Sequence, residues 1–121
     1  MKPLVLVVED EPAVANVTCR MLEALGYDCT SASSGKTAAA LLESDDVSVD
    51  LAIIDVVLPD MLGTDLAKSV RERSPRFPLI FTSAYPSYRT DPPRVSGALF
   101  VAKPYLREEL GSAIARLLPP T

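Results

Sequence analysis

The stretch that most constrains the fold is Leu51–Asp55, four apolar residues followed by a carboxylate. Two of the four are β-branched and none is polar, which is typical of a strand buried on both faces of a parallel sheet. In an open parallel sheet, ligands bind just beyond the carboxyl ends of the strands. Asp55 therefore lies at the edge where a sheet of this kind binds its ligands. Pro59 and Gly63 follow it and predict a loop that leads into a helix.

Five segments with the composition of strands alternate with segments of helical spacing or irregular sequence. The strands are expected at Leu4–Val8, 27–32, Leu51–Asp55, 79–82 and 98–102. Helices are expected at 12–25, at 34–43, at 64–72 and after Pro104, with the double proline at Pro119 closing the last one. This alternation predicts an α/β fold, a doubly wound five-stranded parallel sheet with helices on both faces. One domain over residues 1–121 accounts for the whole pattern.

The first helix is expected to begin at Pro12, with Asp10 or Glu11 as its cap, and to end before Gly26. Four apolar residues recur at helical spacing and predict the apolar stripe of this helix: Val14, Val17, Met21 and Leu25. In the last helix, the residues expected on the apolar face are Leu106, Leu110, Ala113, Ile114 and Leu117. Three acids in a row before Pro12 are more than a helix cap needs, so a cation site competes with capping as their explanation.

Composition excludes several classes of function. The net charge of −4 argues against a nucleic-acid-binding surface, and no apolar run is long enough to cross a membrane. The chain has no histidine, which excludes His-based zinc sites, Ser-His or Cys-His nucleophile pairs and a phosphohistidine on this chain. Cys19 and Cys29 form no CxxC pair, and we expect them to be free, partly buried thiols in a reducing cytoplasm.

Polar residues close four of the five predicted strands, namely Glu9 with Asp10, Asp55, Ser83 and Lys103. These strand ends converge on one edge of a doubly wound sheet. Three carboxylates this close repel one another, and their pKa values rise unless a cation neutralises them. An all-oxygen donor set suits Mg²⁺. A lysine and a hydroxyl beside that ion form a site for a phosphoryl group, with Asp55 as the nucleophile that carries it as an acyl phosphate.

Four motifs occur along the chain: the acidic pair in VVEDE, the pattern Asp55-x-x-x-Pro59-x-x-x-Gly63, Ser83-Ala84 after FT, and Lys103-Pro104 after FVA. In this order and spacing, the sequence resembles the receiver domain of the two-component response-regulator family along nearly its whole length. The resemblance implies a flavodoxin-like strand order of 2-1-3-4-5. It also implies that a sensor histidine kinase or a histidine phosphotransfer protein phosphorylates Asp55.

The same resemblance implies a set of ligands for Mg²⁺. Asp10, Asp55 and the carbonyl of Val57 would hold the ion, and Glu9 would act through water. Lys103 would assist phosphoryl transfer. Such a domain catalyses only its own phosphorylation and dephosphorylation.

Family receivers also couple phosphorylation to a change of shape. Ser83 resembles the hydroxyl that moves toward the phosphoryl group, and Phe100 resembles the aromatic residue that turns inward behind it. The partner controlled in this way would be a downstream protein, with homodimer formation as a further possibility and no direct contact with nucleic acid or membrane. The chain would be either a free-standing regulator or the receiver of a hybrid histidine kinase.

The sequence departs from the family pattern at the fourth helix. Pro86, Pro92 and Pro93 predict a helix that is short, displaced or absent. The usual output face of the family consists of the fourth helix, the fifth strand and the last helix. This departure brings that face into question. Val57 and Tyr85 flank the site where many relatives have polar groups, and they are expected to alter the access of water and the lifetime of the phosphate.

Three alternative functions differ in chemistry from a phosphorylated receiver. An aspartyl-phosphate phosphatase needs a second acid two residues after its nucleophile, and Val57 occupies that place. A flavin- or dinucleotide-binding domain needs a glycine- or hydroxyl-rich turn after its first strand, and the turn after Val8 is acidic. The third alternative is a receiver-shaped protein-binding module that phosphate does not switch, which only the proline-rich fourth segment supports.

Overall fold

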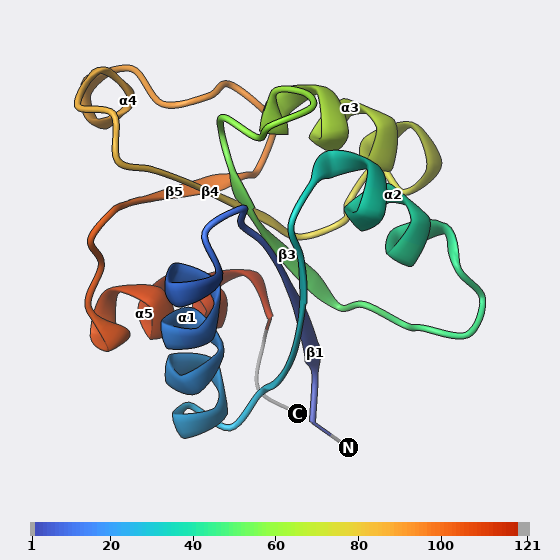
Figure 1. The fold of residues 1–121 in the computed structure, drawn as a ribbon, viewed down its shortest axis with the longest axis horizontal. Coiled ribbons are helices and arrows are strands. Elements are labelled where there is room, and N and C mark those ends of the chain that lie inside the picture. Colours follow the sequence, from blue (N-terminus) through green and yellow to red (C-terminus); the bar gives the residue numbers. More distant parts are fainter. Residues whose placement is uncertain (1, 119–121) are drawn as a thin grey trace.

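A computed structural model describes residues 2–118 and contains one five-stranded parallel sheet in the order β2-β1-β3-β4-β5 (Figure 1). The strands are β1 (Leu4–Val8), β2 (Asp28–Ala32), β3 (Leu51–Asp55), β4 (Leu79–Ser83) and β5 (Leu99–Ala102). All neighbouring pairs are parallel. The predicted fold class and strand order are therefore confirmed. Each strand begins or ends within one residue of its expected position.

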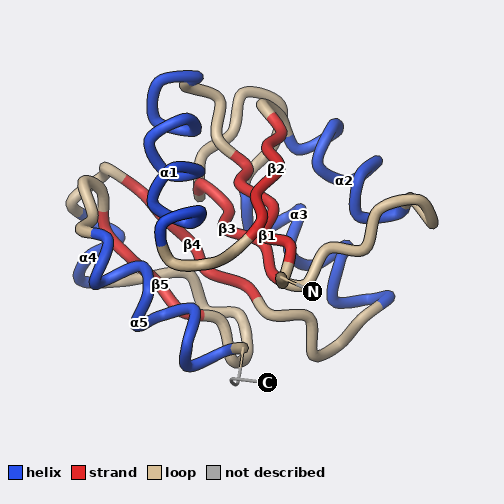
Figure 2. Tube along the Cα trace, turned by 90° about the horizontal axis from the view of Figure 1, so that it is seen from below, coloured by secondary structure: helices blue, strands red, loops and turns tan. Residues whose placement is uncertain are grey.

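Helices cover both faces of the sheet. They are α1 (Pro12–Ala24), α2 (Gly35–Glu43), α3 (Gly63–Arg73), α4 (Ser87–Thr90) and α5 (Arg107–Leu117). Figures 1 and 2 show α1 and α5 on one face and α2 and α3 on the other. This arrangement follows from the alternation of strands and helices, because each parallel connection crosses back over one face of the sheet.

The core has two halves, which the alternation of side chains along each strand separates. In β1, Leu6 and Val8 join the half under α2 and α3, whereas Val5 and Val7 join the half under α1 and α5. All five residues of β3 are buried. The uninterrupted apolar character of these strands is therefore explained by burial on both faces.

Helix α1 begins at Pro12 and Gly26 has a φ of 96°, as the sequence predicts. The predicted cap is wrong, because the N-cap residue Glu11 accepts no hydrogen bond through its side chain. Its backbone N–H donates instead to Glu9 Oε2 at 3.1 Å. The preceding carboxylate thus takes up a donor near the start of the helix.

The predicted apolar stripe of α1 is also wrong, because the buried side is shifted from it by one residue. The buried residues are Ala15, Thr18 and Leu22, whereas Val17 is 51% exposed. In the same way, Leu106 is 64% exposed and precedes α5 instead of packing under it. In α1 the helix turns the small Ala15 and the polar Thr18 toward the core, which a count of apolar positions does not detect. In α5 the expected residues Leu110, Ala113 and Ile114 are buried.

The expectation of free thiols is wrong, because Cys19 and Cys29 form a disulfide bond. Cys19 lies on the side of α1 that faces β2, and Cys29 lies on β2 itself. The chain reverses direction between them, so their Cα atoms lie 5.6 Å apart. That distance falls within the range that a disulfide spans. The bond attaches α1 to the edge strand of the sheet.

The fourth helix is short, as its prolines predict: α4 has four residues and none of them is buried. Val56 and Leu58, in the loop after β3, are both buried in the core half under α2 and α3. The double proline expected to close α5 lies outside the described residues. Within residues 2–118, no helix combines the length and the apolar character needed to span a membrane.

The first prediction concerns Gly63, whose missing side chain lets α3 approach the end of β3. A Cβ placed there would overlap the carbonyl oxygen of Asp55 and lie 2.8 Å from Ile54 Cγ2. We expect Gly63→Ala to lower the free energy of unfolding by about 1–3 kcal/mol, because backbone and buried strand must shift. Urea denaturation measures this change.

Gly111→Ala is the matched control, since its Cβ would meet only the end of the Leu25 side chain at 3.1 Å. Alanine also favours a helix over glycine by roughly 1 kcal/mol. A Gly63→Ala protein as stable as the Gly111→Ala protein would contradict the close approach of α3 to β3.

The second prediction concerns the disulfide. Double replacement of Cys19 and Cys29 by serine is expected to lower the free energy of unfolding by about 2–3 kcal/mol, because the unfolded chain loses the closure of a short loop. Denaturation of the oxidised parent and the double variant measures it. Equal unfolding midpoints, or two titratable thiols in the unreduced native parent, would contradict the bond.

Candidate functional site

The candidate site lies at the carboxyl edge of the sheet, where backbone hydrogen bonds extend the strand ladders by one residue. The N–H of Glu9 donates to the carbonyl of Ala32 at 3.0 Å, next to the end of β1. The N–H of Lys103 donates to the carbonyl of Ser83 at 2.9 Å, which joins β4 to the residue after β5. Asp55 pairs with Thr82 in the register of β3 and β4. These ladders bring residues from β1, β3 and β5 to the same level.

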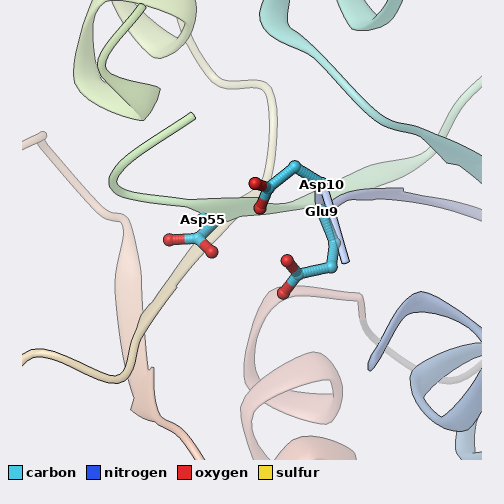
Figure 3. A group of neighbouring side chains, drawn as sticks. All are labelled: Glu9, Asp10 and Asp55. Carbon is cyan, nitrogen blue, oxygen red and sulfur yellow. The ribbon is translucent and has the colours of Figure 1, made fainter. Parts of the chain in front are cut away.

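Three carboxylates converge at this edge. Glu9, Asp10 and Asp55 each offer an oxygen, and these oxygens all lie within 4.8 Å of one another (Figure 3). Glu9 and Asp55 are buried, whereas Asp10 is exposed. The predicted convergence of the acids is confirmed. The cluster is open to solvent on the side of the exposed acid, which gives a cation or a small anion a way in.

Lys103 lies between the two buried acids. Its Nζ donates to Asp55 Oδ2 at 2.7 Å and also to Glu9 Oε1, and its side chain is 14% exposed. One ammonium group therefore serves two buried carboxylates. This ratio leaves one negative charge without a partner inside the site, and Asp10 adds a second at its surface.

Burial and ion pairing shift the pKa values of the partners. Burial raises the pKa of the Glu9 carboxyl, although the hydrogen bonds from Lys103 and from the Glu11 N–H act in the opposite direction. Burial by itself would lower the pKa of Lys103, but its hydrogen bonds to Asp55 and Glu9 outweigh burial and raise it. Lys103 is therefore charged at neutral pH and acts as the built-in counter-ion of the acids.

The loop after β3 holds the second oxygen of Asp55. The N–H of Val57 donates to Asp55 Oδ1 at 3.2 Å, and Gly63 N–H donates to the Val56 carbonyl at 2.6 Å. Val57 is 36% exposed beside the site. Pairing between Val57 and Leu62 closes the loop into a narrow turn. The residue whose carbonyl is a predicted Mg²⁺ ligand is thus held in a defined position.

The two predicted switch residues occupy different surroundings. Ser83 ends β4 and is buried, and its Oγ accepts a hydrogen bond from the Tyr85 N–H at 3.0 Å. Phe100 lies on β5, is partly buried and packs against the core half under α2 and α3. Tyr85 is 56% exposed and stands edge-on to Tyr88, with ring centroids 6.4 Å apart. The roles of Ser83 and Phe100 stay predictions.

Sequence reasoning missed two contacts that hold the site loops. Asp60, in the loop after β3, accepts hydrogen bonds from Gly35 N–H and Lys36 N–H, each at 2.9 Å, and so caps α2 from a distance. The hydroxyl of Tyr105, two residues after Lys103, bonds to Thr18 on α1. The available signals were an acid in an exposed turn, Asp60, and a tyrosine among apolar residues, Tyr105. Neither signal indicates which distant residue is the hydrogen-bond partner.

The third prediction tests the shared counter-ion without metal. Lys103→Met is expected to lower the free energy of unfolding at pH 7.5 by about 2–4 kcal/mol, because it leaves buried Glu9 and Asp55 without a cation. Without the ammonium, the pKa of Glu9 in the native state would rise further above its value in the unfolded chain. Since the native protein would hold its proton more tightly, the loss should shrink as the pH falls toward 4.5.

Asp55→Asn tests the same arrangement from the opposite side. It leaves Glu9 and Lys103 as a balanced pair, so we expect the metal-free variant to be at least as stable as the parent. It should also recover part of the loss caused by Lys103→Met in the double variant. Urea denaturation at both pH values measures all four proteins. Additive effects, or a loss independent of pH, would contradict the shared ammonium.

Comparisons with known proteins assign the chain to a family. A family model described as the response regulator receiver domain matches residues 5–115. The chain is 33% identical over 116 residues to sensor kinase CckA of Brucella abortus, covering 94% of the chain and 12% of that protein. It is 34% identical over 119 residues to transcriptional regulatory protein TrcR of Mycobacterium tuberculosis, covering 94% of the chain and 44% of that protein. The chain thus spans less than half the length of these two relatives.

Solved structures share the fold over almost the whole chain. Response regulator protein TrrA from Thermotoga maritima, in complex with Mg(2+)-BeF, is 30% identical with a TM-score of 0.83, covering 98% of this chain and 100% of that chain. The receiver domain from the hybrid histidine kinase CckA is 32% identical with a TM-score of 0.79, covering 95% and 98%. The strand order, the acidic cluster and these matches agree: the chain belongs to the response-regulator receiver family of two-component signalling systems.

Proposed function

We propose that Asp55 accepts a phosphoryl group from a phosphohistidine of a sensor histidine kinase or a histidine phosphotransfer protein, and that residues 1–121 form one receiver unit. The observation that carries this proposal is the convergence of Glu9, Asp10 and Asp55 around Lys103 at one edge of the sheet. Asp55 is the acid at the centre of this group, because it ends the middle strand of the sheet.

The residues present fit Mg²⁺. The donors are oxygens only, three carboxylates lie within 4.8 Å of one another, and the exposed acid opens the cluster to solvent. Asp10, Asp55 and the Val57 carbonyl would hold the ion. Glu9 is already bonded to Lys103, which supports a role through water for this acid. A bound ion would offset the negative charge of the acids and of the incoming phosphoryl oxygens.

The chain's own side chains supply the remaining chemistry. A carboxylate oxygen of Asp55 forms the new bond to phosphorus while the bond between phosphorus and the donor's imidazole nitrogen breaks, and the electron pair stays with the imidazole. The Lys103 ammonium offsets charge on the phosphoryl oxygens. The Ser83 hydroxyl donates to one of them. In this proposal the domain catalyses only its own phosphorylation and dephosphorylation.

A change of shape would follow from Ser83. Its Oγ now accepts from the Tyr85 N–H, so a move toward the phosphoryl group would release the start of the α4 segment. That segment buries none of its helical residues, which makes its rearrangement inexpensive. Phe100 would then turn inward on β5. The proposed outcome is control of a downstream protein partner, with homodimer formation as one form of that control.

The fourth prediction tests phosphoryl acceptance directly. Incubation with acetyl phosphate and Mg²⁺ is expected to add one phosphoryl group to the parent and none to Asp55→Asn, as measured by intact mass. Asp46→Asn is the matched control, because it removes the same charge from an exposed acid in the loop between α2 and β3. It should be phosphorylated like the parent.

Two outcomes would contradict the proposal. One is an equal gain of mass in the parent and in Asp55→Asn, which would place the phosphate elsewhere. The other is no gain in the parent together with no binding of beryllofluoride. That second result would favour the receiver-shaped binding module, which the shortened α4 also permits.

A further inference from the structure

A buried hydrogen bond joins α1 to the loop that carries Lys103. Thr18 Oγ1 and the Tyr105 hydroxyl lie 2.5 Å apart, although the residues are 87 positions apart in sequence. Thr18 is 1% exposed and Tyr105 is 9% exposed. Their surroundings in this half of the core are mainly apolar. Each hydroxyl is therefore held to the other, because a buried hydroxyl without a partner is costly.

Tyr105 is the inward anchor of its loop. Among residues 103–106, all within the described part of the chain, Tyr105 alone is buried, whereas Pro104 and Leu106 are exposed. Apart from those of the Lys103 ammonium, the other hydrogen bonds of the loop involve its backbone. Lys103 N–H bonds to the Ser83 carbonyl, and the Lys103 carbonyl accepts from Arg89 Nη2 at 3.2 Å on the surface.

The bond also lies between the two segments that supply the Glu9–Lys103 ion pair. Glu9 directly follows β1 and precedes α1, and Lys103 directly follows β5. A lysine side chain has many rotamers, so its ammonium stays between two carboxylates only if the backbone beneath it is fixed. Burial raises the pKa of the Tyr105 phenol, so its hydroxyl remains protonated over the range in which phosphoryl transfer would occur.

We propose that Tyr105 is a positioning residue: its hydrogen bond to Thr18 fixes the loop after β5 against α1 and thereby holds the Lys103 ammonium between Glu9 and Asp55. This inference rests on the proposed function, because Lys103 acts on the phosphoryl group. Tyr105 itself touches neither the acids nor the phosphoryl donor. Its effect on phosphorylation passes through the position of Lys103.

The fifth prediction uses a double-mutant cycle of Tyr105→Phe and Thr18→Val. Each change removes one hydroxyl and keeps the shape of the side chain. We expect each to lower the initial rate of phosphorylation by acetyl phosphate by about threefold to tenfold, with the double variant no slower than the singles. Thr18→Ser keeps the hydroxyl and should restore most of the parent rate. The affinity for Mg²⁺, measured by calorimetry, should not decrease, because Lys103 is not among the proposed ligands and its displacement removes a competing positive charge from Asp55.

Leu22→Ala controls for a general loss of packing. Leu22 lies on α1 in the same half of the core and is fully buried, but it takes no part in the hydrogen bond. At a temperature where this variant is folded, it should be phosphorylated at the parent rate. A rate for Tyr105→Phe equal to that of the parent, or a further loss in the double variant, would overturn the positioning role.

A second measurement does not depend on phosphorylation. In the metal-free parent, the Lys103 ammonium should give a resolved ¹⁵N signal protected from exchange, because both of its buried partners hold it. Tyr105→Phe should weaken or abolish that signal, whereas Leu22→Ala should not. An unchanged signal in Tyr105→Phe would overturn this inference even if the parent is phosphorylated. If the parent is not phosphorylated but Tyr105→Phe still loses the ¹⁵N signal, the result would contradict the proposed function and leave the positioning role intact.

Discussion

The site depends on one electrostatic arrangement: the carboxylates of Glu9 and Asp55 share the ammonium of Lys103. The three side chains follow β1, end β3 and follow β5, so they meet only if the strands end at the same level. Buried charges are tolerated when they are paired. Here the pairing is incomplete by one positive charge, which is the electrostatic basis of the Mg²⁺ site that we propose. Asp10 lies exposed beside the buried pair and would give the ion access.

The helices differ in how firmly they are attached. Helix α1 is fixed to β2 by the disulfide and to the loop after β5 by the bond between Thr18 and Tyr105. Helix α4 has no buried residue and follows a serine whose hydroxyl bonds to the backbone of its own segment. The attached side of the molecule holds the charged groups in place. The loosely packed side contains α4, the segment for which we propose a rearrangement, so the proposed response lies apart from the charged groups of the site.

Most of the fold could be predicted because its signals are local. Leu51–Asp55 is apolar without interruption and is buried on both faces, and Pro12 and Gly26 mark the two ends of α1. Three prolines predicted the short fourth helix. The convergence of the acids could also be predicted, since the carboxyl ends of parallel strands share one edge. Strand order came from resemblance to a family, because alternation alone permits several orders.

The sequence by itself determined the strands, the helix ends and the acids at one edge, since each depends on residues close together in the chain. Only the tertiary structure decided which side of α1 is buried, where Thr18 replaces the predicted Val17. It also decided that Cys19 meets Cys29 and that Lys103 is shared by two acids. These contacts depend on how a helix is rotated against distant strands and loops. Apolar periodicity does not report that rotation, because a buried threonine with a tyrosine partner is as well satisfied as a valine.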